Sequence, residues 1–357
     1  MAARGIDLAM STTRWDPVCT RPEGLVAPSR VDRTGKAGPT WRAARGPGWR
    51  SVAPGLYVPS AVEPLVEQRI VEQAGRLSPG GRSGCVTAWA ALRWRGAAFF
   101  DGLAPGGEVE LPVPLSLGGA GAQLRPAPGC ALERVQLAPA EREVVAGLPL
   151  TTTQRALFDE VRRRGSLWSA VEAIDMAAAA GLISAWVFAI YIGTMNSRNG
   201  VPLARHAVSL AVDESRSPRE TWFRLVWTLQ AGLPEPLVNE PVYDHEGRLI
   251  GIPDLLDPVA GLVGEYDGAH HKSVEQHRRD VRREEDFRDH GLEYVTVVRG
   301  DSRNVAAARV RAARGRAKFL PRESCAWTLE RPAWDPRPET LDERLGRLGL
   351  VSALTRS

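Results

Sequence analysis

Hydrophobic and polar residues follow their most regular pattern in the last third of the chain. Apolar residues at helical spacing predict a helix over residues 219–231, and apolar extended stretches follow at 237–243 and 249–256. Residues 257–261 are rich in turn formers and lead into another apolar stretch, at 261–267. We therefore expect residues 249–256 and 261–267 to form a hairpin.

The same pattern continues with a helix over residues 273–290, which Gly291 is expected to end, and with a β-branched strand over residues 293–299. Because its Tyr-Val-Thr-Val-Val run is apolar enough, we expect this strand to be central in its sheet. A basic helix follows it. The order helix, three strands, helix, strand, helix predicts an α/β domain over residues 215–317, with a mixed sheet flanked by helices.

Residues 52–214 predict a separate α+β domain that is mainly helical. A strand is expected at residues 55–58 and helices at 62–77 and 85–94. Strands are expected at residues 108–115 and 132–137, and the prolines in the first of these favour a sheet edge. Helical spacing then dominates as far as residue 214.

The two ends of the chain show less order in their pattern. Residues 1–50 are dominated by Pro, Gly, Arg, Thr and Ala without a helical or strand period, so a disordered tail is expected there. Residues 318–357 are expected to form a loosely packed C-terminal tail with one short helix near residues 339–350. Tryptophans occur in both tails, and they suggest a third role, a scaffold for protein contacts.

Composition sets the outer limits of these expectations. The chain has 357 residues, 43% hydrophobic and 25% charged, which is enough for two modest domains with tails. It contains no continuous apolar run of about 20 residues and no pattern typical of a secretory signal. The cysteines are scattered, so neither a zinc site nor a disulfide framework is expected: Cys19, Cys85, Cys130 and Cys325. We expect a cytoplasmic protein that does not enter a membrane.

Three carboxylates come together in the expected hairpin. Asp254 lies in its first strand, and Glu265 and Asp267 lie at the end of its second. Side chains two apart in a strand share a face, so Glu265 and Asp267 would point the same way, with Asp254 alongside Glu265. Carboxylates with a backbone carbonyl suit Mg²⁺ or Mn²⁺, which can assist phosphodiester hydrolysis. The alternative is a solvated rim of acidic residues at a strand end.

The motif around these acids is similar to that of a known family. Pro253–Asp254 and Glu265–Tyr266–Asp267, followed by Gly268 and His271, resemble the PD-(D/E)xK nuclease superfamily, in its branch related to very-short-patch-repair endonucleases. The resemblance covers residues 215–317 and implies a restriction-endonuclease-like fold. It also implies that Asp254 and Glu265 bind the metal ion, with the Tyr266 carbonyl as a third ligand.

The resemblance implies roles for further residues. Asp267 stands where the superfamily commonly has a lysine, so proton transfer would fall to His271, whose ordinary pKa lies near neutrality. Asp267 would then complete or support the site, and Lys272 would be an alternative source of positive charge. Glu220 matches an acid that the family often carries on the helix before the sheet. Glu220 could equally serve only as a negative charge at the N-terminus of its helix.

Basic residues near the acidic motif suggest a nucleic-acid partner. They cluster at residues 277–283 and 309–318, and Lys272, Arg279 and Arg283 would hold the DNA backbone through salt-dependent contacts with phosphates. A net charge of +4 is by itself too small to identify a nucleic-acid-binding protein. The alternative for each basic run is a solvated helix face.

The N-terminal domain carries a more diffuse resemblance. The strand at residues 55–58, the turn at 147–153 and the helix at 170–180 follow the order of bacterial proteins that fuse an AbiEi-like antitoxin region to such a nuclease domain. This resemblance implies binding of DNA or of a protein partner by residues 52–214. Two functions remain open: a metal-dependent DNA endonuclease, and an antitoxin-type DNA-binding regulator without turnover. Either a homodimer or a toxin–antitoxin complex fits the sequence.

Overall fold

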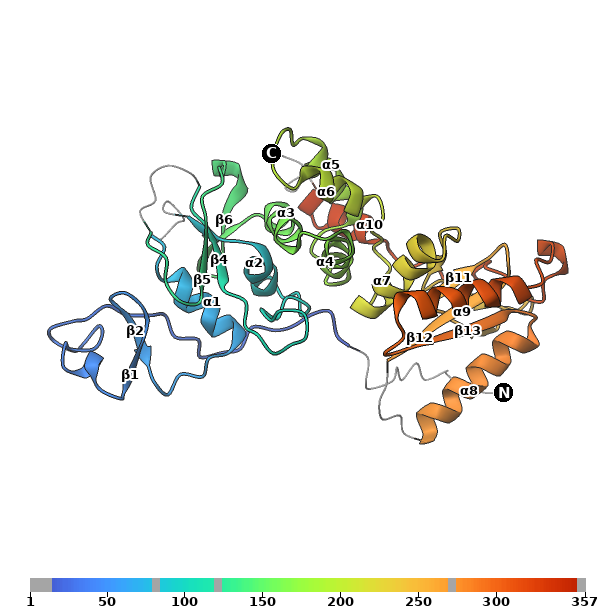
Figure 1. Cartoon of the computed structure of the whole chain (residues 1–357), viewed down its shortest axis with the longest axis horizontal. Coiled ribbons are helices and arrows are strands. Elements are labelled where there is room, and N and C mark those ends of the chain that lie inside the picture. Colours follow the sequence, from blue (N-terminus) through green and yellow to red (C-terminus); the bar gives the residue numbers. More distant parts are fainter. Residues whose placement is uncertain (1–14, 79–83, 119–123, 269–273, 352–357) are drawn as a thin grey trace.

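The computed structural model describes residues 15–78, 84–118, 124–268 and 274–351. It is a mixed α/β protein in which two units, each a sheet with helices packed on it, follow one another along the chain (Figure 1). This confirms the expected α/β class. Every helix within the described ranges is too short or too polar to cross a membrane.

A five-stranded sheet with the order β5-β4-β3-β7-β6 forms the framework of the first unit. Strand β4 runs antiparallel to β3 and parallel to β5, whereas β7 runs parallel to β3 and antiparallel to β6. A separate antiparallel hairpin, β1–β2, precedes this sheet. The strands are β1 (Trp49–Ala53), β2 (Leu56–Pro59), β3 (Cys85–Val86), β4 (Val113–Ser116), β5 (Cys130–Glu133), β6 (Arg142–Val145) and β7 (Leu148–Thr151).

Helices pack on this sheet and on one another to enclose the largest hydrophobic core, which contains buried Trp89, Phe158 and Phe188. Ser166 and Ser184 cap two of these helices by accepting from the backbone N–H groups of Ser169 and Val187. The helices are α1 (Val66–Ala74), α2 (Ala88–Trp94), α3 (Thr153–Arg164), α4 (Leu167–Ala179), α5 (Ala185–Gly193) and α6 (Val201–Val208), with 3₁₀ turns η1 (Ala43–Arg45) and η3 (Pro139–Glu141).

Two expectations for this unit are wrong in detail. Residues 85–94 are not one helix, because Cys85–Val86 is a strand and α2 begins only at Ala88. Strand β4 contains Pro114 and yet lies inside the sheet. Thr87 donates its N–H to the Pro114 carbonyl at 3.0 Å, while the Thr87 carbonyl accepts from Ala91 in α2. Because the Thr87 carbonyl already accepts from Ala91, a residue with an N–H at position 114 would gain no bond to it. Proline at position 114 therefore costs the sheet little stability.

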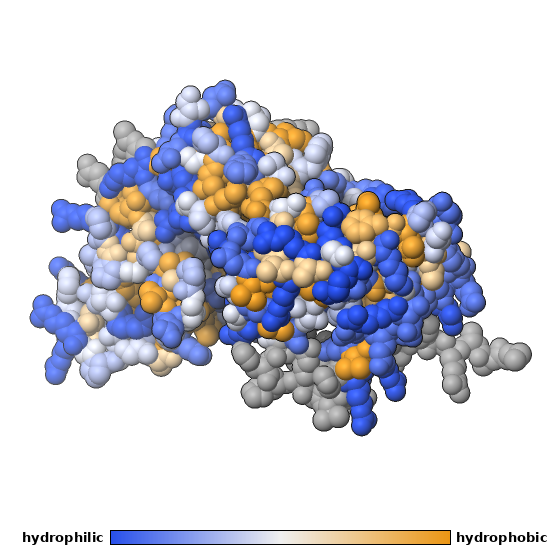
Figure 2. Space-filling model, turned by 45° about the vertical axis from the view of Figure 1, so that its right-hand side comes forward, coloured by the Kyte–Doolittle hydropathy of each residue, from blue (hydrophilic) through white to orange (hydrophobic). Residues whose placement is uncertain are grey.

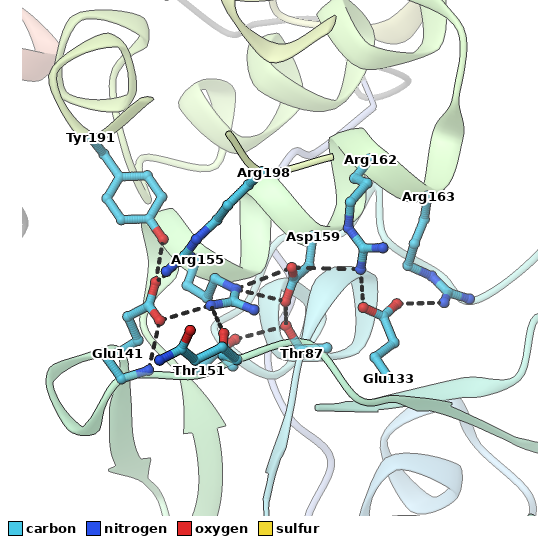
Figure 3. A network of polar contacts seen from close by, with 12 residues as sticks. Thr87, Glu133, Glu141, Thr151, Arg155, Asp159, Arg162, Arg163, Tyr191 and Arg198 are labelled. Atoms are coloured by element: carbon cyan, nitrogen blue, oxygen red, sulfur yellow. Dashed lines mark hydrogen bonds and ion pairs between the residues drawn. The ribbon is translucent and has the colours of Figure 1, made fainter. Parts of the chain in front are cut away.

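A buried network of charged side chains ties α3 to the sheet (Figure 3). Arg155, which is fully buried, donates to Asp159 one helical turn away at 3.1 Å and to Glu141 of η3 at 2.7 Å. Thr87 donates to Asp159 at 2.7 Å, and Tyr191 of α5 donates to Glu141 at 2.8 Å. Each buried charge therefore has partners, as a low-dielectric interior requires. We interpret this network as structural.

The second unit contains a four-stranded mixed sheet with the order β13-β12-β11-β8. Strand β11 is antiparallel to β8 and β12, and β12 is parallel to β13. A second, two-stranded sheet pairs β9 with β10. The strands are β8 (Leu237–Val238), β9 (Val242–Tyr243), β10 (Leu249–Gly251), β11 (Leu255–Asp257), β12 (Leu262–Asp267) and β13 (Glu293–Val298).

The helices of the second unit cover both faces of this sheet (Figure 1). Helix α7 and the π-helical turn after it approach β12 closely: a Cβ on Gly264 would lie 2.9 Å from Trp227 and 3.0 Å from Phe223. Glycine at position 264 therefore lets these aromatic rings pack directly on the strand. The helices are α7 (Pro218–Leu225), the π-helical turn η4 (Val226–Gln230), α8 (Val274–Asp289), α9 (Arg303–Arg316) and the 3₁₀ turn η5 (Arg322–Ser324). Helix α10 (Leu341–Arg347) follows them in the chain but lies against the first unit, where Ser184 donates to Asp342 (Figure 1).

The expected hairpin is confirmed in its inner part only. Leu255 pairs with Gly264 and Asp257 with Leu262, but residues 249–251 pair with β9 instead. The strand at residues 293–298 is a sheet edge, so the expectation that it is central is wrong. It is apolar because both of its faces are covered: Val295 and Val297 share a core with α9, and Tyr294 packs beside Phe287 of α8.

A buried ion pair joins the two units. Asp175 of α4 accepts from Arg224 of α7 at 2.7 Å and from Thr221 at 2.8 Å, and both charged side chains are almost completely buried. Asp175 also accepts from the backbone N–H of Val212 at 2.9 Å in the segment that connects the units. One carboxylate thus fixes three segments together.

Both tails are more ordered than expected within the described residues. Ser29 and Tyr57 exchange two backbone hydrogen bonds of 2.9 Å, which hold the N-terminal segment on the β1–β2 hairpin. The disordered tail is therefore wrong for residues 15–50, and residues 1–14 lie outside the described ranges. The loosely packed C-terminal tail is also wrong: Trp327 is buried in a core with Phe287 and Leu256, and Thr328 pairs with Tyr243. Helix α10 confirms the short helix.

Candidate metal centre

Asp254 lies in a bend directly before β11, and two hydrogen bonds fix its place beside β12. Its carbonyl accepts from the backbone N–H of Asn239 at 3.2 Å, and its side-chain Oδ2 accepts from the backbone N–H of Tyr266 at 2.8 Å. Tyr266 lies two residues beyond Gly264, the last residue of β12 that pairs with β11. The Asp254 carboxylate therefore takes the place of a backbone acceptor where the pairing of β11 with β12 ends. It lies next to Glu265, as the sequence predicted.

Glu265 is the centre of a group of acids. Its side chain is 13% exposed, and burial raises its pKa well above the usual range of a glutamate. The negative charge of Asp254 raises this pKa further, and Asp280 and Glu220 add smaller effects in the same direction. Ionised Glu265 is therefore costly unless a cation lies beside it.

Arg283 of α8 supplies a positive charge to Glu265. Its Nη2 donates to Glu265 Oε1 at 2.5 Å and also to the backbone carbonyl of Ile252. This contact lowers the Glu265 pKa, but burial and the other acids outweigh it. We expected Arg283 to contact DNA phosphates; the structure instead directs its guanidinium inward, onto the acidic cluster. Its side chain nonetheless remains 36% exposed.

Glu220 serves the N-terminus of its own helix. Its Oε2 accepts from the backbone N–H of Arg216 and from the side-chain amide of Asn239, both at 2.8 Å, while Ser217 Oγ accepts from the Glu220 N–H. These bonds keep the carboxylate at the first turn of α7, which fits the alternative that Glu220 serves as a negative charge at the N-terminus of its helix. The charge of Glu220 still acts on Glu265, so this acid supports the cluster from α7.

Tyr266 and Asp267 complete β12. The N–H and the carbonyl of a strand residue point to the same edge, so the Tyr266 carbonyl faces the Asp254 side, where its N–H bonds. The Tyr266 ring contacts Trp222 edge-on at 6.1 Å between ring centres. Asp267 ends the strand, and its carbonyl accepts from the Arg299 N–H at 2.9 Å. Because it lies two residues after Glu265, Asp267 is on the same face of β12.

The sequence also placed His271, Lys272 and Arg279 in the site. His271 and Lys272, to which the sequence assigned proton transfer and positive charge, lie outside the described residues. Arg279 is exposed on α8, one turn before Arg283. Its position fits a contact with solvent or with a polyanion.

The donor set of this site is compatible with a small divalent ion. Mg²⁺ typically takes one or two protein carboxylates, retains several waters and uses substrate phosphates for the rest of its shell. Asp254 and Glu265 would supply the carboxylates, and the Tyr266 carbonyl would supply a neutral oxygen. Within the described ranges, groups of three or more acidic, histidine or cysteine side chains placed to hold an ion are absent. The fit therefore depends on this pair and on backbone oxygen.

Sequence reasoning missed two parts of the site. The Ile252 carbonyl accepts from Arg283, and backbone acceptors carry no signal in the sequence. Tyr294 of β13 also lies near the acids: burial raises the pKa of its hydroxyl, and the charge of Glu265 raises it further. The parallel pairing of β12 with β13, with Val263 opposite Tyr294, brings this ring to the site. That pairing joins residues about 30 positions apart and depends on α8 between them.

Comparisons with family models, with curated proteins and with solved structures give no match to this chain.

Proposed function

We propose that this protein is a metal-dependent DNA endonuclease that hydrolyses phosphodiester bonds with Mg²⁺ or Mn²⁺ held by Asp254 and Glu265. The observation that carries the proposal is the hydrogen bond between Asp254 Oδ2 and the Tyr266 N–H, which sets a carboxylate beside buried Glu265. Two neighbouring carboxylates, one of them buried, are stable as anions only with a cation between or beside them. The location that we expect for such an enzyme is the cytoplasm.

The mixed sheet and its helices support a restriction-endonuclease-like fold for residues 215–317. Asp254 lies directly before β11, and Glu265 lies on β12, the antiparallel neighbour of β11. Helix α7 packs on β12. This order is the one that a PD-(D/E)xK domain, related to very-short-patch-repair endonucleases, would need.

When bound, the ion would orient water and stabilise charge on the phosphate under attack. The residues of the chain have separate tasks. The Tyr266 N–H fixes the orientation of Asp254, and burial under α8 limits the access of water to Glu265. Asp267 extends the acidic face, and His271 is the proposed group for proton transfer.

DNA is the proposed substrate because the helix that contacts Glu265 also carries exposed basic residues. Arg278, Arg279 and Arg282 are exposed on α8, whose residue Arg283 contacts Glu265. Figure 2 shows hydrophilic residues over much of the face that the second unit presents, with scattered hydrophobic groups between them. The exposed arginines of α8 suit phosphate contacts that weaken as salt rises.

Nicking of supercoiled plasmid DNA in Mg²⁺ or Mn²⁺ tests the proposal. We expect nicking by the wild type and a loss of about 100-fold or more in Asp254→Asn and Glu265→Gln, the scale typical of removing a group that stabilises charge in the transition state. Glu285→Gln, which changes an exposed acid of α8, is the matched control and should nick normally. Equal inertness of the wild type and Asp254→Ala in both ions, on several forms of DNA, would refute the catalytic claim.

One observation favours a second function, an antitoxin-type regulator that binds DNA without cleaving it. Arg283 already donates to Glu265 in the structure. In the sequence, Asp267 stands where a nuclease of this kind commonly has its lysine. In such a regulator, residues 52–214 would bind DNA or a toxin partner, alone or as a homodimer. Tight DNA binding without any Mn²⁺ binding in calorimetry would favour this second function.

A further inference from the structure

The position of Arg283 is set by the packing of its helix. Phe287 lies one turn further along α8, is fully buried and contacts β10 at Gly251, where a Cβ would come within 2.6 Å of the Phe287 ring. Glycine at position 251 therefore lets α8 approach β10 closely. This anchor holds the guanidinium of Arg283 against the Ile252 carbonyl and against Glu265, the centre of the acidic cluster.

We propose that Arg283 is a built-in counter-cation of the acidic site, and that a divalent ion bound by Asp254 and Glu265 displaces its guanidinium from Glu265. This inference rests on the proposed metal site. It goes beyond it by stating how the site is held without metal and which side chain must move when metal binds.

Competition for one carboxylate is the physical basis of the proposal. Arg283 Nη2 and a divalent ion would share the Glu265 carboxylate, and two cations at one anion repel each other. An arginine stays charged at every pH that a protein tolerates, so Arg283 can relieve this repulsion only by moving away. Its partial exposure gives the guanidinium a path towards solvent. The exposed neighbour Arg279 marks the surface that it would reach.

Displacement would couple the two binding events of a nuclease. The released guanidinium would lie on the same face of α8 as Arg279, where a phosphate of the substrate could accept from it. Metal binding would thereby create a phosphate contact, and a bound phosphate would in turn favour the metal-bound site. A purely structural Arg283 would show neither effect.

Calorimetric titration of the full chain with MnCl₂ tests the proposal, because the direction in which an Arg283 substitution changes the Mn²⁺ affinity distinguishes competition from support. Arg283→Gln removes the competing charge, and we expect it to bind Mn²⁺ about five- to tenfold more tightly than the wild type, near the lower end of measured couplings between sites. Arg283→Lys keeps a cation and should bind less tightly than Arg283→Gln. Arg288→Gln, which changes an exposed arginine of the same helix that pairs with Glu284 instead of Glu265, is the control and should match the wild type.

The outcomes separate this inference from the proposed function. If the wild type binds Mn²⁺ but Arg283→Gln binds equally or more weakly, Arg283 supports the ion and the displacement is wrong while the metal site stands. If neither protein binds Mn²⁺, the metal site itself is wrong, and the displacement falls with it.

A second measurement needs no substitution and so does not depend on the variants folding. Rotation of the Arg283 guanidinium about its Nε–Cζ bond, followed by NMR during Mg²⁺ titration of the wild type, should be slow at first and become faster as the ion displaces it. Unchanged rotation at saturating Mg²⁺ would overturn the proposal.

Discussion

The side chain of Asp254 accepts a hydrogen bond from the backbone N–H of Tyr266 at 2.8 Å, and this bond places one acid beside another from a different strand. The same bond gives Asp254 a structural task as well as its proposed metal-binding one. Substitutions that keep the acceptor but remove the charge can separate the two tasks.

Asp254→Asn should retain the bond to Tyr266, whereas Asp254→Ala leaves that N–H without its acceptor. We expect the alanine variant to lose about 1–2 kcal/mol more of the free energy of unfolding in urea than the asparagine variant does. Both should lose Mn²⁺ binding in calorimetry, because an amide oxygen is a much weaker ligand than a carboxylate for this ion. Wild-type Mn²⁺ affinity in Asp254→Asn would contradict the assignment of Asp254 as a ligand.

Arg224→Met should be among the more destabilising single substitutions, because it leaves buried Asp175 without its counter-charge. The expected loss in the free energy of unfolding is about 3–5 kcal/mol. Arg248→Met is the control, because Arg248 also pairs with an aspartate, Asp244. The Arg248 side chain is 73% exposed, so this variant should lose less than about 1 kcal/mol of the free energy of unfolding. Urea denaturation of both variants measures the difference. Similar losses would mean that the Asp175–Arg224 pair is not an important link between the units.

These contrasts show what the sequence could and could not reveal. The pairing of β11 with β12 and the approach of Asp254 to Glu265 were predictable, because both are local: a turn joins two apolar stretches, and the pleat fixes which side chains share a face. The edge position of β13 was not predictable. Apolar residues on both faces of a strand indicate that both faces are covered, but they do not indicate whether a further strand pairs with its outer edge.

Long-range packing explains the other differences. Nothing near Arg283 in the sequence indicates whether its guanidinium turns outward to solvent or inward to Glu265, 18 residues earlier; the contact of Phe287 with Gly251 decides it. The C-terminal tail was expected to be loose because its pattern is weak. Its order comes from single anchors, such as Trp327 in a core and the Trp334 indole N–H, which donates to the Gly247 carbonyl at 3.0 Å.

Leu345 tests whether α10 is an integral part of the fold. Its side chain is fully buried, and α10 also contacts the first unit through the bond that Ser184 donates to Asp342. Leu345→Ala should lower the free energy of unfolding by about 2–5 kcal/mol, as for other buried leucines. Leu348→Ala, one turn later and 56% exposed, should cost less than about 0.5 kcal/mol. Equal, small effects in urea denaturation would mean that α10 packs only weakly.

Asp213 should make stability depend on pH. Burial raises the pKa of Asp213 from 3.8 to about 6, and the charges of Glu214, Asp342 and Asp175 act in the same direction. The hydrogen bond that the carboxylate accepts from the Ala185 N–H lowers this pKa, but by less. Because the folded pKa lies above the unfolded one, Asp213 is a source of stability at low pH that is lost as pH rises to about 6.

Asp213→Asn removes this titration. Relative to the wild type, the variant should therefore gain stability between about pH 4 and about pH 6 and show no further relative change above it. The measurement is the free energy of unfolding in urea at a series of pH values. A difference between the variant and the wild type that stays constant over this range would contradict the assignment.

The central claim is that Asp254 and Glu265 bind a divalent ion, and crystals of the full chain soaked in MnCl₂ test it most directly. The anomalous scattering of manganese locates the ion without reference to activity. We predict a peak between the carboxylates of Asp254 and Glu265, within reach of the Tyr266 carbonyl, with the Arg283 guanidinium moved away from Glu265. A map without manganese at these acids at saturating Mn²⁺, with Arg283 still bonded to Glu265, would contradict the account.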